Sequence, residues 1–148
     1  MISTMTDKTF LFVDSSAWIS LVVINDINHQ KAVSVFSSFN TKTKLYISFF
    51  IINETITKIR KIFSQEKASE LFNQYKKLEK EKFLTILPVD RNIIEKGVAL
   101  LSKHPTPNTF SLTDATNVVL MEKYHIPTLF SFDRDFKKLK TPYLSILP

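Results

Sequence analysis

The sequence predicts a single α/β domain, residues 1–148, in which helices cover both faces of a mostly parallel sheet. Short runs rich in β-branched and aromatic residues alternate with longer segments of helical periodicity. The short runs are almost continuously apolar, which is typical of strands buried on both faces. With 148 residues and 44% hydrophobic content, the chain can build one core and has little room for a second domain.

The expected strands are short and rich in Val, Ile, Leu and Phe. They lie at Phe10–Val13, Leu45–Ser48, Leu84–Val89, Thr128–Phe132 and Leu144–Leu147. Pro105 and Pro107 mark a loop before the last two strands, and Pro127 directly precedes the fourth. No internal repeat, low-complexity tract or linker interrupts this order.

Four segments between the strands have apolar residues three and four positions apart, as helices do. They are Phe50–Phe63, Gln65–Lys82, Asn92–Ser102 and a helix that begins near Ser111. In Phe50–Phe63 the expected inward residues are Ile51, Ile52, Thr55, Ile56, Ile59 and Ile62. In Gln65–Lys82 they are Ala68, Leu71, Phe72, Tyr75 and Leu78. In Asn92–Ser102 they are Ile93, Ile94, Leu101 and either Val98 or Ala99.

Composition excludes several kinds of chemistry. The chain has no cysteine, which removes disulfides, thiolate nucleophiles and cysteine-bound zinc and suits a reducing cytoplasm. Its one glycine, Gly97, lies within a helical pattern, so the sequence contains no glycine-rich phosphate loop. The three histidines, His29, His104 and His125, are far apart and have no metal-ligand spacing. The net charge of +6 favours a polyanionic partner without establishing one.

No segment has the pattern of a membrane span or a secretory leader. The longest apolar stretches, such as Trp18–Ile24, fall far below the ~20 residues that cross a bilayer. Asp7 and Lys8 interrupt the N-terminal segment, and nothing before Thr9 indicates a structural element. We therefore expect a soluble cytoplasmic protein, and the sequence leaves open whether Met1 or Met5 is the first residue.

Carboxylates stand at the ends of expected strands, where ligands bind in parallel α/β sheets. Asp14 directly follows the first strand, and Asp133 follows the fourth, with Asp135 two residues later. Glu54 lies in the first turns of the helix after the second strand, among phenylalanines and isoleucines. Asp114 stands at the start of the fourth expected helix, so it can point towards the same edge of the sheet.

Each of these acids also has a purely structural interpretation. Asp14 could cap a helix that follows it, and Asp114 could complete a cap opened by Ser111. Glu54 could be a solvated helix residue, and the segment 133–135 could form a turn.

Asp90 serves as an internal comparison for the other acids. It follows an expected strand and precedes an expected helix, as a helix-capping residue does. We expect Asp90 to be an N-cap without a catalytic role.

Four segments together resemble the acidic motifs of PIN domains, the fold used by VapC-type toxins of toxin–antitoxin pairs. They are Leu11–Ile19 with Asp14, Ile51–Thr55 with Glu54, Ser111–Ala115 with Asp114, and Leu129–Phe136 with Asp133 and Asp135. Each motif alone is only a short apolar run with an acid, but all four occur in the family order across nearly the whole chain. Because all four expected acids are present, the resemblance argues against a catalytically inactive member.

The resemblance implies a PIN-like three-layer α/β/α sandwich and a metal-dependent endoribonuclease that hydrolyses RNA phosphodiester bonds. The implied site comprises the catalytic and metal-binding residues Asp14, Glu54, Asp114 and Asp133, a further metal ligand Asp135, and the supporting residues Ser15 and Ser131. Crowded carboxylates repel one another unless hard cations intervene, and Mg²⁺ (or Mn²⁺) prefers such oxygen ligands. A cation held there would position water for attack on a phosphodiester.

Basic residues around an acidic pocket would have to attract the RNA. The first candidates follow the fourth motif and are Arg134, Lys137, Lys138 and Lys140. A second basic group lies on the helix that carries Glu54 and comprises Lys58, Arg60 and Lys61. Each of these residues could equally be a solvated surface charge.

Small size without an appended domain favours a stand-alone toxin that a small antitoxin protein holds in check. The resemblance also implies a homodimer, with the apolar faces of Phe50–Phe63 and Gln65–Lys82 as candidates for self-association. Core packing accounts for the phenylalanines equally well. The alternative function is a non-catalytic PIN-like module that binds RNA or protein. The sequence leaves open the RNA target, the antitoxin and the preferred metal.

Overall fold

A parallel five-stranded sheet forms the centre of the computed structural model, which describes residues 7–139 and 145–148. The strands are β1 (Thr9–Val13), β2 (Thr43–Ser48), β3 (Leu84–Leu87), β4 (Thr128–Phe130) and β5 (Ser145–Leu147). Their order is β3-β2-β1-β4-β5, and each of these neighbouring pairs is parallel. The predicted sheet is confirmed, because each expected run overlaps one of these strands.

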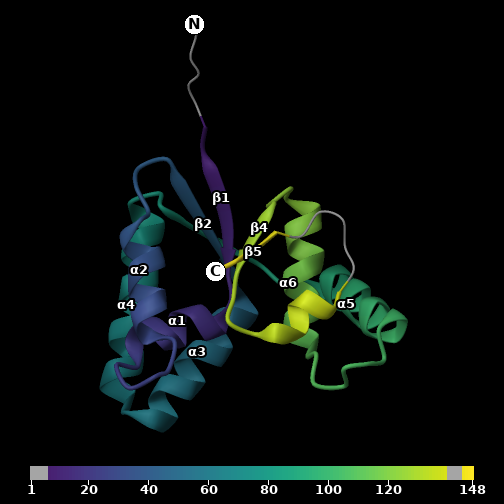
Figure 1. Cartoon of the computed structure of the whole chain (residues 1–148), viewed down its shortest axis with the longest axis horizontal. Helices are drawn as coiled ribbons and strands as arrows, with labels where there is room; N and C mark the ends of the chain where they lie inside the picture. Colours follow the sequence, from purple (N-terminus) through teal and green to yellow (C-terminus); the bar gives the residue numbers. More distant parts are fainter. Residues whose placement is uncertain (1–6, 140–144) are drawn as a thin grey trace, which may run out of the picture.

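Helices cover both faces of this sheet. They are α1 (Ser15–Val22), α2 (His29–Ser37), α3 (Phe49–Ile62), α4 (Gln65–Lys80), α5 (Arg91–Lys103) and α6 (Leu112–Lys123), followed by the short 3₁₀ helix η1 (Arg134–Lys138). Helices α1 to α4 lie together on one side of the sheet, and α5 and α6 pack against each other on the other side (Figure 1). The structure therefore has the three-layer α/β/α architecture expected from the sequence.

Sequence periodicity predicts the long helices better than the short ones. The four expected helices correspond to α3, α4, α5 and α6, and the predicted ends lie within two residues of the observed ones. Helix α1 was anticipated only as a segment that Asp14 could cap, and α2 was not predicted. Over nine residues α2 buries only Ala32 and has no side-chain cap at its N-terminus, so it lacks the usual sequence signals of a helix.

The inward face of α5 differs from the prediction. Val98 and Ala99 are exposed, whereas Gly97 is buried together with Ile93. A Cβ atom at Gly97 would lie 3.0 Å from Cγ2 of Thr116 on α6. The prediction of Val98 or Ala99 is wrong because α5 and α6 approach too closely for a larger side chain, and the glycine marks that contact.

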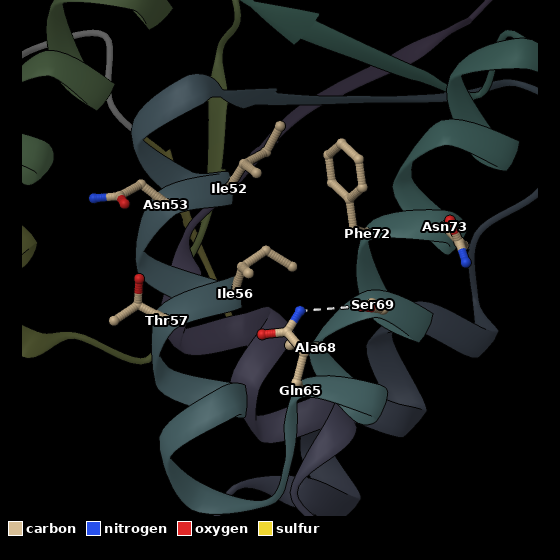
Figure 2. Close-up of a pocket in the computed structure, with 9 residues that line it drawn as sticks. All are labelled: Ile52, Asn53, Ile56, Thr57, Gln65, Ala68, Ser69, Phe72 and Asn73. Carbon is tan, nitrogen blue, oxygen red and sulfur yellow. Dashed lines mark hydrogen bonds between the residues drawn. The ribbon is translucent and has the colours of Figure 1, made fainter.

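Two further residues that were expected inward remain largely exposed. Ile62 of α3 and Phe72 of α4 are 47% and 40% exposed, although Ile51, Ile59 and Tyr75 on the same helices are fully buried. Phe72 faces Ile52 and Ile56 across a shallow pocket between the two helices (Figure 2). The apolar faces of α3 and α4 are therefore wider than the core that covers them.

The order of the strands creates a crevice at the carboxyl end of β1. The chain passes from β1 to β2 and β3 on one side, then crosses to β4 and β5 on the other. Val13, the last residue of β1, pairs with Phe130, the last residue of β4, and both are fully buried. Such a reversal of strand order is the place where α/β sheets bind ligands.

Some sequence-based expectations fall outside the described residues: the alternative starts Met1 and Met5, the basic residue Lys140, and the first residue of the last expected strand, Leu144. Within residues 7–139 and 145–148, none of the helices combines the length and apolar character needed to span a bilayer.

Candidate active site

Asp14 lies where β1 and β4 end side by side. Its backbone N–H donates to the carbonyl oxygen of Phe130 over 2.9 Å, and the residue is only 2% exposed. Its Oδ2 accepts hydrogen bonds from the hydroxyls of Ser131 (2.8 Å) and Ser16 (3.0 Å). Its Oδ1 accepts one from Nδ2 of Asn117 (3.1 Å). Three donors therefore fix the carboxylate in one orientation.

The two serine hydroxyls are themselves oriented by the loop that follows β4. The backbone N–H of Phe132 donates to Oγ of Ser16 (2.9 Å), and that of Asp133 donates to Oγ of Ser131 (3.0 Å). The two hydroxyl oxygens lie 3.2 Å apart. Each hydroxyl thus accepts a backbone hydrogen bond and can direct its own proton at Asp14.

Burial dominates the acidity of Asp14. Loss of solvent is the largest effect and, together with the smaller effect of the nearby charge of Glu54, raises the pKa of this carboxyl from 3.8 to about 6. Hydrogen bonds from Ser131, from Ser16 and from the backbone of Ser15 act in the opposite direction. Burial therefore disfavours the ionised form of Asp14, and the hydrogen-bond donors offset only part of this cost.

Asp114 caps a helix and also lies near other acids of the expected site. It completes a capping box at the start of α6: its Oδ2 accepts from the backbone N–H of Ser111 (2.9 Å), and its own N–H donates to Oγ of Ser111 (3.1 Å). Asp114 is 7% exposed, and burial raises its pKa to about 7. The charges of Asp14 and Asp133 contribute to this rise, so the capping carboxylate lies within electrostatic reach of both acids.

Glu54 and Asp133 stand at the open side of this group. Both are half-buried, and both line a groove of about 740 Å³ together with Ser15 and Ser16. Oδ1 of Asp133 also caps η1 by accepting from the backbone N–H of Asp135 (2.9 Å), as the turn interpretation expected. The four acids of the expected site are therefore linked in pairs: the charge of Glu54 acts on Asp14, those of Asp14 and Asp133 act on Asp114, and Glu54 and Asp133 share the groove.

Asp135 is oriented differently from the other four acids. Its Oδ2 accepts from the hydroxyl of Thr109 over 2.6 Å, and its Oδ1 lies 3.5 Å from Nζ of Lys138. Both carboxylate oxygens thus contact groups outside the acidic cluster. A role for Asp135 as a metal ligand remains a prediction from the motif alone.

The basic residues of η1 and the comparison residue Asp90 are also placed by the structure. Arg134, Lys137 and Lys138 are exposed, and Lys138 is the one paired with Asp135. Oδ1 of Asp90 accepts from the backbone N–H of Ile93 over 2.9 Å at the start of α5. The expectation that Asp90 is an N-cap is confirmed.

Sequence reasoning missed two residues of the site, Ser16 and Asn117. It named Ser15, which lines the groove, whereas the neighbouring hydroxyl that donates to Asp14 belongs to Ser16. Asn117 follows Asp114 by one helical turn and is fully buried. A polar residue on the face of α6 that carries Asp114 is the signal that could have identified it.

The donor set fits a hard cation, although no complete ligand shell is preformed. Among the residues that the structure describes, no three His, Asp or Glu side chains are grouped closely enough to hold a metal ion. However, Mg²⁺ usually binds through only one or two carboxylates and keeps several waters. Oδ1 of the buried Asn117 has no hydrogen-bond partner in the described residues, so this acceptor is available to a water or another donor.

Comparisons with known proteins agree with this architecture. The PIN domain family model matches residues 11–142. The structure of VapC20 from Mycobacterium tuberculosis, a toxin that cleaves the sarcin–ricin loop, superimposes with a TM-score of 0.75 at 23% identity, covering 86% of this chain and 93% of that one. VapBC2 from Rickettsia felis, bound to a DNA fragment from its promoter, gives a TM-score of 0.65 at 11% identity, with coverages of 93% and 98%.

A third similar structure is a toxin–antitoxin complex from Klebsiella pneumoniae, with a TM-score of 0.61, 14% identity and coverages of 90% and 94%. No curated protein sequence matches the chain significantly. At these identities the solved structures establish a shared fold.

Proposed function

Because the chain belongs to the PIN domain family, we propose that it is a metal-dependent endoribonuclease, and more narrowly a VapC-like toxin. Residues 1–148 would form a single nuclease domain. The observation that carries this proposal is the link between the end of β1 and the start of α6: Asn117, one turn after the buried Asp114, donates a 3.1 Å hydrogen bond to the buried Asp14, and the charge of Asp14 raises the pKa of Asp114. Two buried acids that are costly to ionise within electrostatic reach of each other are more consistent with a cation site than with two unrelated helix caps.

In the proposed site, Asp14, Glu54, Asp114 and Asp133 would hold Mg²⁺ or Mn²⁺. When bound, the cation would supply an acidified water and neutralise charge on the leaving oxygen of a phosphodiester. Hydrogen bonds from Ser16, Ser131 and Asn117 keep the carboxylate of Asp14 in a fixed orientation for this task. Such support from neighbouring donors is typical of metal-binding carboxylates.

The similar proteins support the substrate and partner classes. VapC20 is a toxin that cleaves the sarcin–ricin loop. By analogy with it, we propose RNA as the substrate of this chain. The Klebsiella structure is a toxin–antitoxin complex. By analogy with it, we propose a small antitoxin as the partner. A cytoplasmic location would follow from an RNA substrate inside the cell.

We further propose a homodimer formed through the exposed apolar residues of α3 and α4. Ile62, Phe63 and Phe72 are each at least 40% exposed, and Phe72 borders the pocket between the two helices. Covering such residues is a common reason for self-association. Size-exclusion chromatography with light scattering should give the mass of a dimer, and a monomer at all concentrations would contradict this part of the proposal.

The alternative is a PIN-like module that binds RNA or protein without cutting it. One observation favours it: no preformed group of three metal-binding side chains is present among the described residues. Incubating the purified protein with a mixed RNA pool, in Mg²⁺ or Mn²⁺ and in EDTA, separates the two functions. Metal-dependent cleavage supports the nuclease, whereas RNA binding without cleavage under every metal condition supports the module.

A further inference from the structure

The groove beside the acids continues along helix α3. Its lining includes Glu54 and, further along the same helix, Lys58 and Lys61. At the helical rise of about 1.5 Å per residue, the two lysines lie about 6 and 10 Å beyond Glu54 along the helix axis. Positions four and seven residues apart share one helix face, so the lysines extend the acidic end of the groove in a single direction.

The orientation of α3 separates these lysines from the third basic residue of the helix. Ile52 and Ile56 point towards Phe72 on α4, whereas Asn53 and Thr57 point away from α4 (Figure 2). Asn53 and Thr57 are also part of the groove lining. Arg60 continues the four-residue row of Ile52 and Ile56 and does not line the groove. The structure thus divides the basic group that the sequence treated as one.

The charges of Lys58 and Lys61 are available to a ligand. Both residues are exposed, and neither forms a salt bridge within residues 7–139 and 145–148. Lys138, a basic candidate next to the fourth motif, is instead paired with Asp135. The groove also contains Phe132, a half-buried aromatic residue beside Asp133, on which an unpaired base could stack.

We propose that Lys58 and Lys61 form a phosphate-binding track for the single-stranded RNA segment next to the cleavage site. The inference rests on the proposed ribonuclease function and adds to it the path of the substrate. Ammonium groups attract phosphates without reading the base sequence, whereas the acids at the end of the groove repel them. The two lysines therefore hold the strand against this repulsion.

The test measures binding of a short labelled single-stranded RNA to an Asp114→Asn protein in Mg²⁺, so that binding is separated from cleavage. In that background Lys58→Gln and Lys61→Gln should each weaken binding roughly threefold to tenfold and lower the slope of log K against log salt by about 0.7. Arg60→Gln is the matched control, because it removes the same charge from the same helix outside the groove. It should leave both quantities close to those of the parent.

A second readout is the rate of RNA cleavage by the lysine variants in the protein that keeps all four acids. Loss of a phosphate contact made equally in the ground and transition states should raise KM and leave kcat unchanged. Unchanged binding and KM in both lysine variants would overturn the track, and so would an equal effect of Arg60→Gln. A polyglutamate peptide serves as a second probe. If the lysine variants lose binding to this peptide but bind RNA as before, the track is overturned and the lysines bind an acidic protein segment instead.

These outcomes are distinct from failure of the proposed function. If the protein with all four acids cleaves RNA while both lysine variants behave as it does, the substrate path is wrong and the nuclease stands. If it neither binds nor cleaves RNA, the proposed function and the track fail together.

Discussion

The hydroxyl of Ser131 donates a 2.8 Å hydrogen bond to Oδ2 of Asp14, a residue 117 positions earlier in the sequence. This contact is a direct result of the sheet topology. Because Val13 and Phe130 pair at the ends of adjacent parallel strands, the next residue of each strand enters the same crevice. The orientation of the central carboxylate is therefore fixed by the register of β1 and β4.

Replacing this hydroxyl should weaken the site without unfolding the protein. Ser131→Ala removes one of three donors to Asp14 and should lower metal affinity and cleavage by roughly 10- to 100-fold. Calorimetric titration with Mn²⁺ measures the affinity independently of activity. Ser102→Ala, on the exposed face of α5, is the control and should change neither quantity. A Ser131→Ala protein that binds Mn²⁺ as the parent does would rule out the orienting role.

A negative charge introduced at position 117 should destabilise the metal-free protein. Asn117→Asp places a second carboxylate next to Asp14 in a buried site, where like charges repel strongly. We expect a lower melting temperature for the metal-free variant near neutral pH and a partial recovery on adding Mg²⁺. Thermal unfolding with and without the metal measures both effects. Equal melting temperatures of variant and parent in EDTA would show that position 117 does not feel the acidic group.

The stability of the metal-free protein should fall as pH rises. Burial raises the pKa of Asp14 to about 6 and that of Asp114 to about 7, so the folded state holds these protons more tightly than the unfolded chain. The resulting stability is present below about pH 4 and is lost as the pH rises through the two folded-state values. Asp114→Asn removes one of these groups and relieves its repulsion of the other.

Urea unfolding of the metal-free proteins tests this pH dependence. The free energy of unfolding of Asp114→Asn should exceed that of the parent by more at about pH 8 than at about pH 5. Taking the difference between the two proteins removes the titration of shared surface groups. A difference that is constant with pH would mean that Asp114 does not titrate abnormally.

The contact between α5 and α6 gives a prediction about stability rather than chemistry. Gly97→Ala would place a Cβ atom 3.0 Å from Cγ2 of Thr116 and 3.1 Å from Cδ1 of Leu112. We expect it to destabilise the protein by about 1–3 kcal/mol, despite the better helix propensity of alanine. Thr116→Ser removes the nearer methyl group and should reduce the cost of Gly97→Ala. An alanine that stabilises the protein would indicate a looser packing of the two helices.

The sequence was informative wherever local pattern and chemistry coincide. Asp14 and Asp133 could be placed at one sheet edge because each follows an apolar strand, and parallel strands end together. Asp114 is ambiguous in the sequence between a cap and a site acid; the structure shows the cap and places its carboxylate within electrostatic reach of Asp14 and Asp133. The roles of Ser16 and Asn117 depend on which side chains cross the crevice. These contacts join segments that are distant in the sequence, so local periodicity cannot predict them.

The sequence likewise does not predict which residues of a helix face the groove. Lys58, Arg60 and Lys61 form one basic group in the sequence, and only the packing of α3 against α4 separates Arg60 from the groove. The burial of Gly97 in place of Val98 has the same origin, since the spacing between α5 and α6 is a tertiary property.

The most direct test of the central claim compares RNA cleavage by the parent protein, Asp14→Asn and Asp90→Asn in Mg²⁺, with circular dichroism to confirm folding. Asp14→Asn should remain folded and lose more activity than the roughly 10- to 100-fold expected when only a hydrogen-bond partner of a metal ligand is removed. Asp90→Asn alters a helix cap on α5 and should cleave at the parent's rate. A folded Asp14→Asn protein that cleaves normally, or an equal loss in Asp90→Asn, would contradict the assignment of the active site to the crevice between β1 and β4.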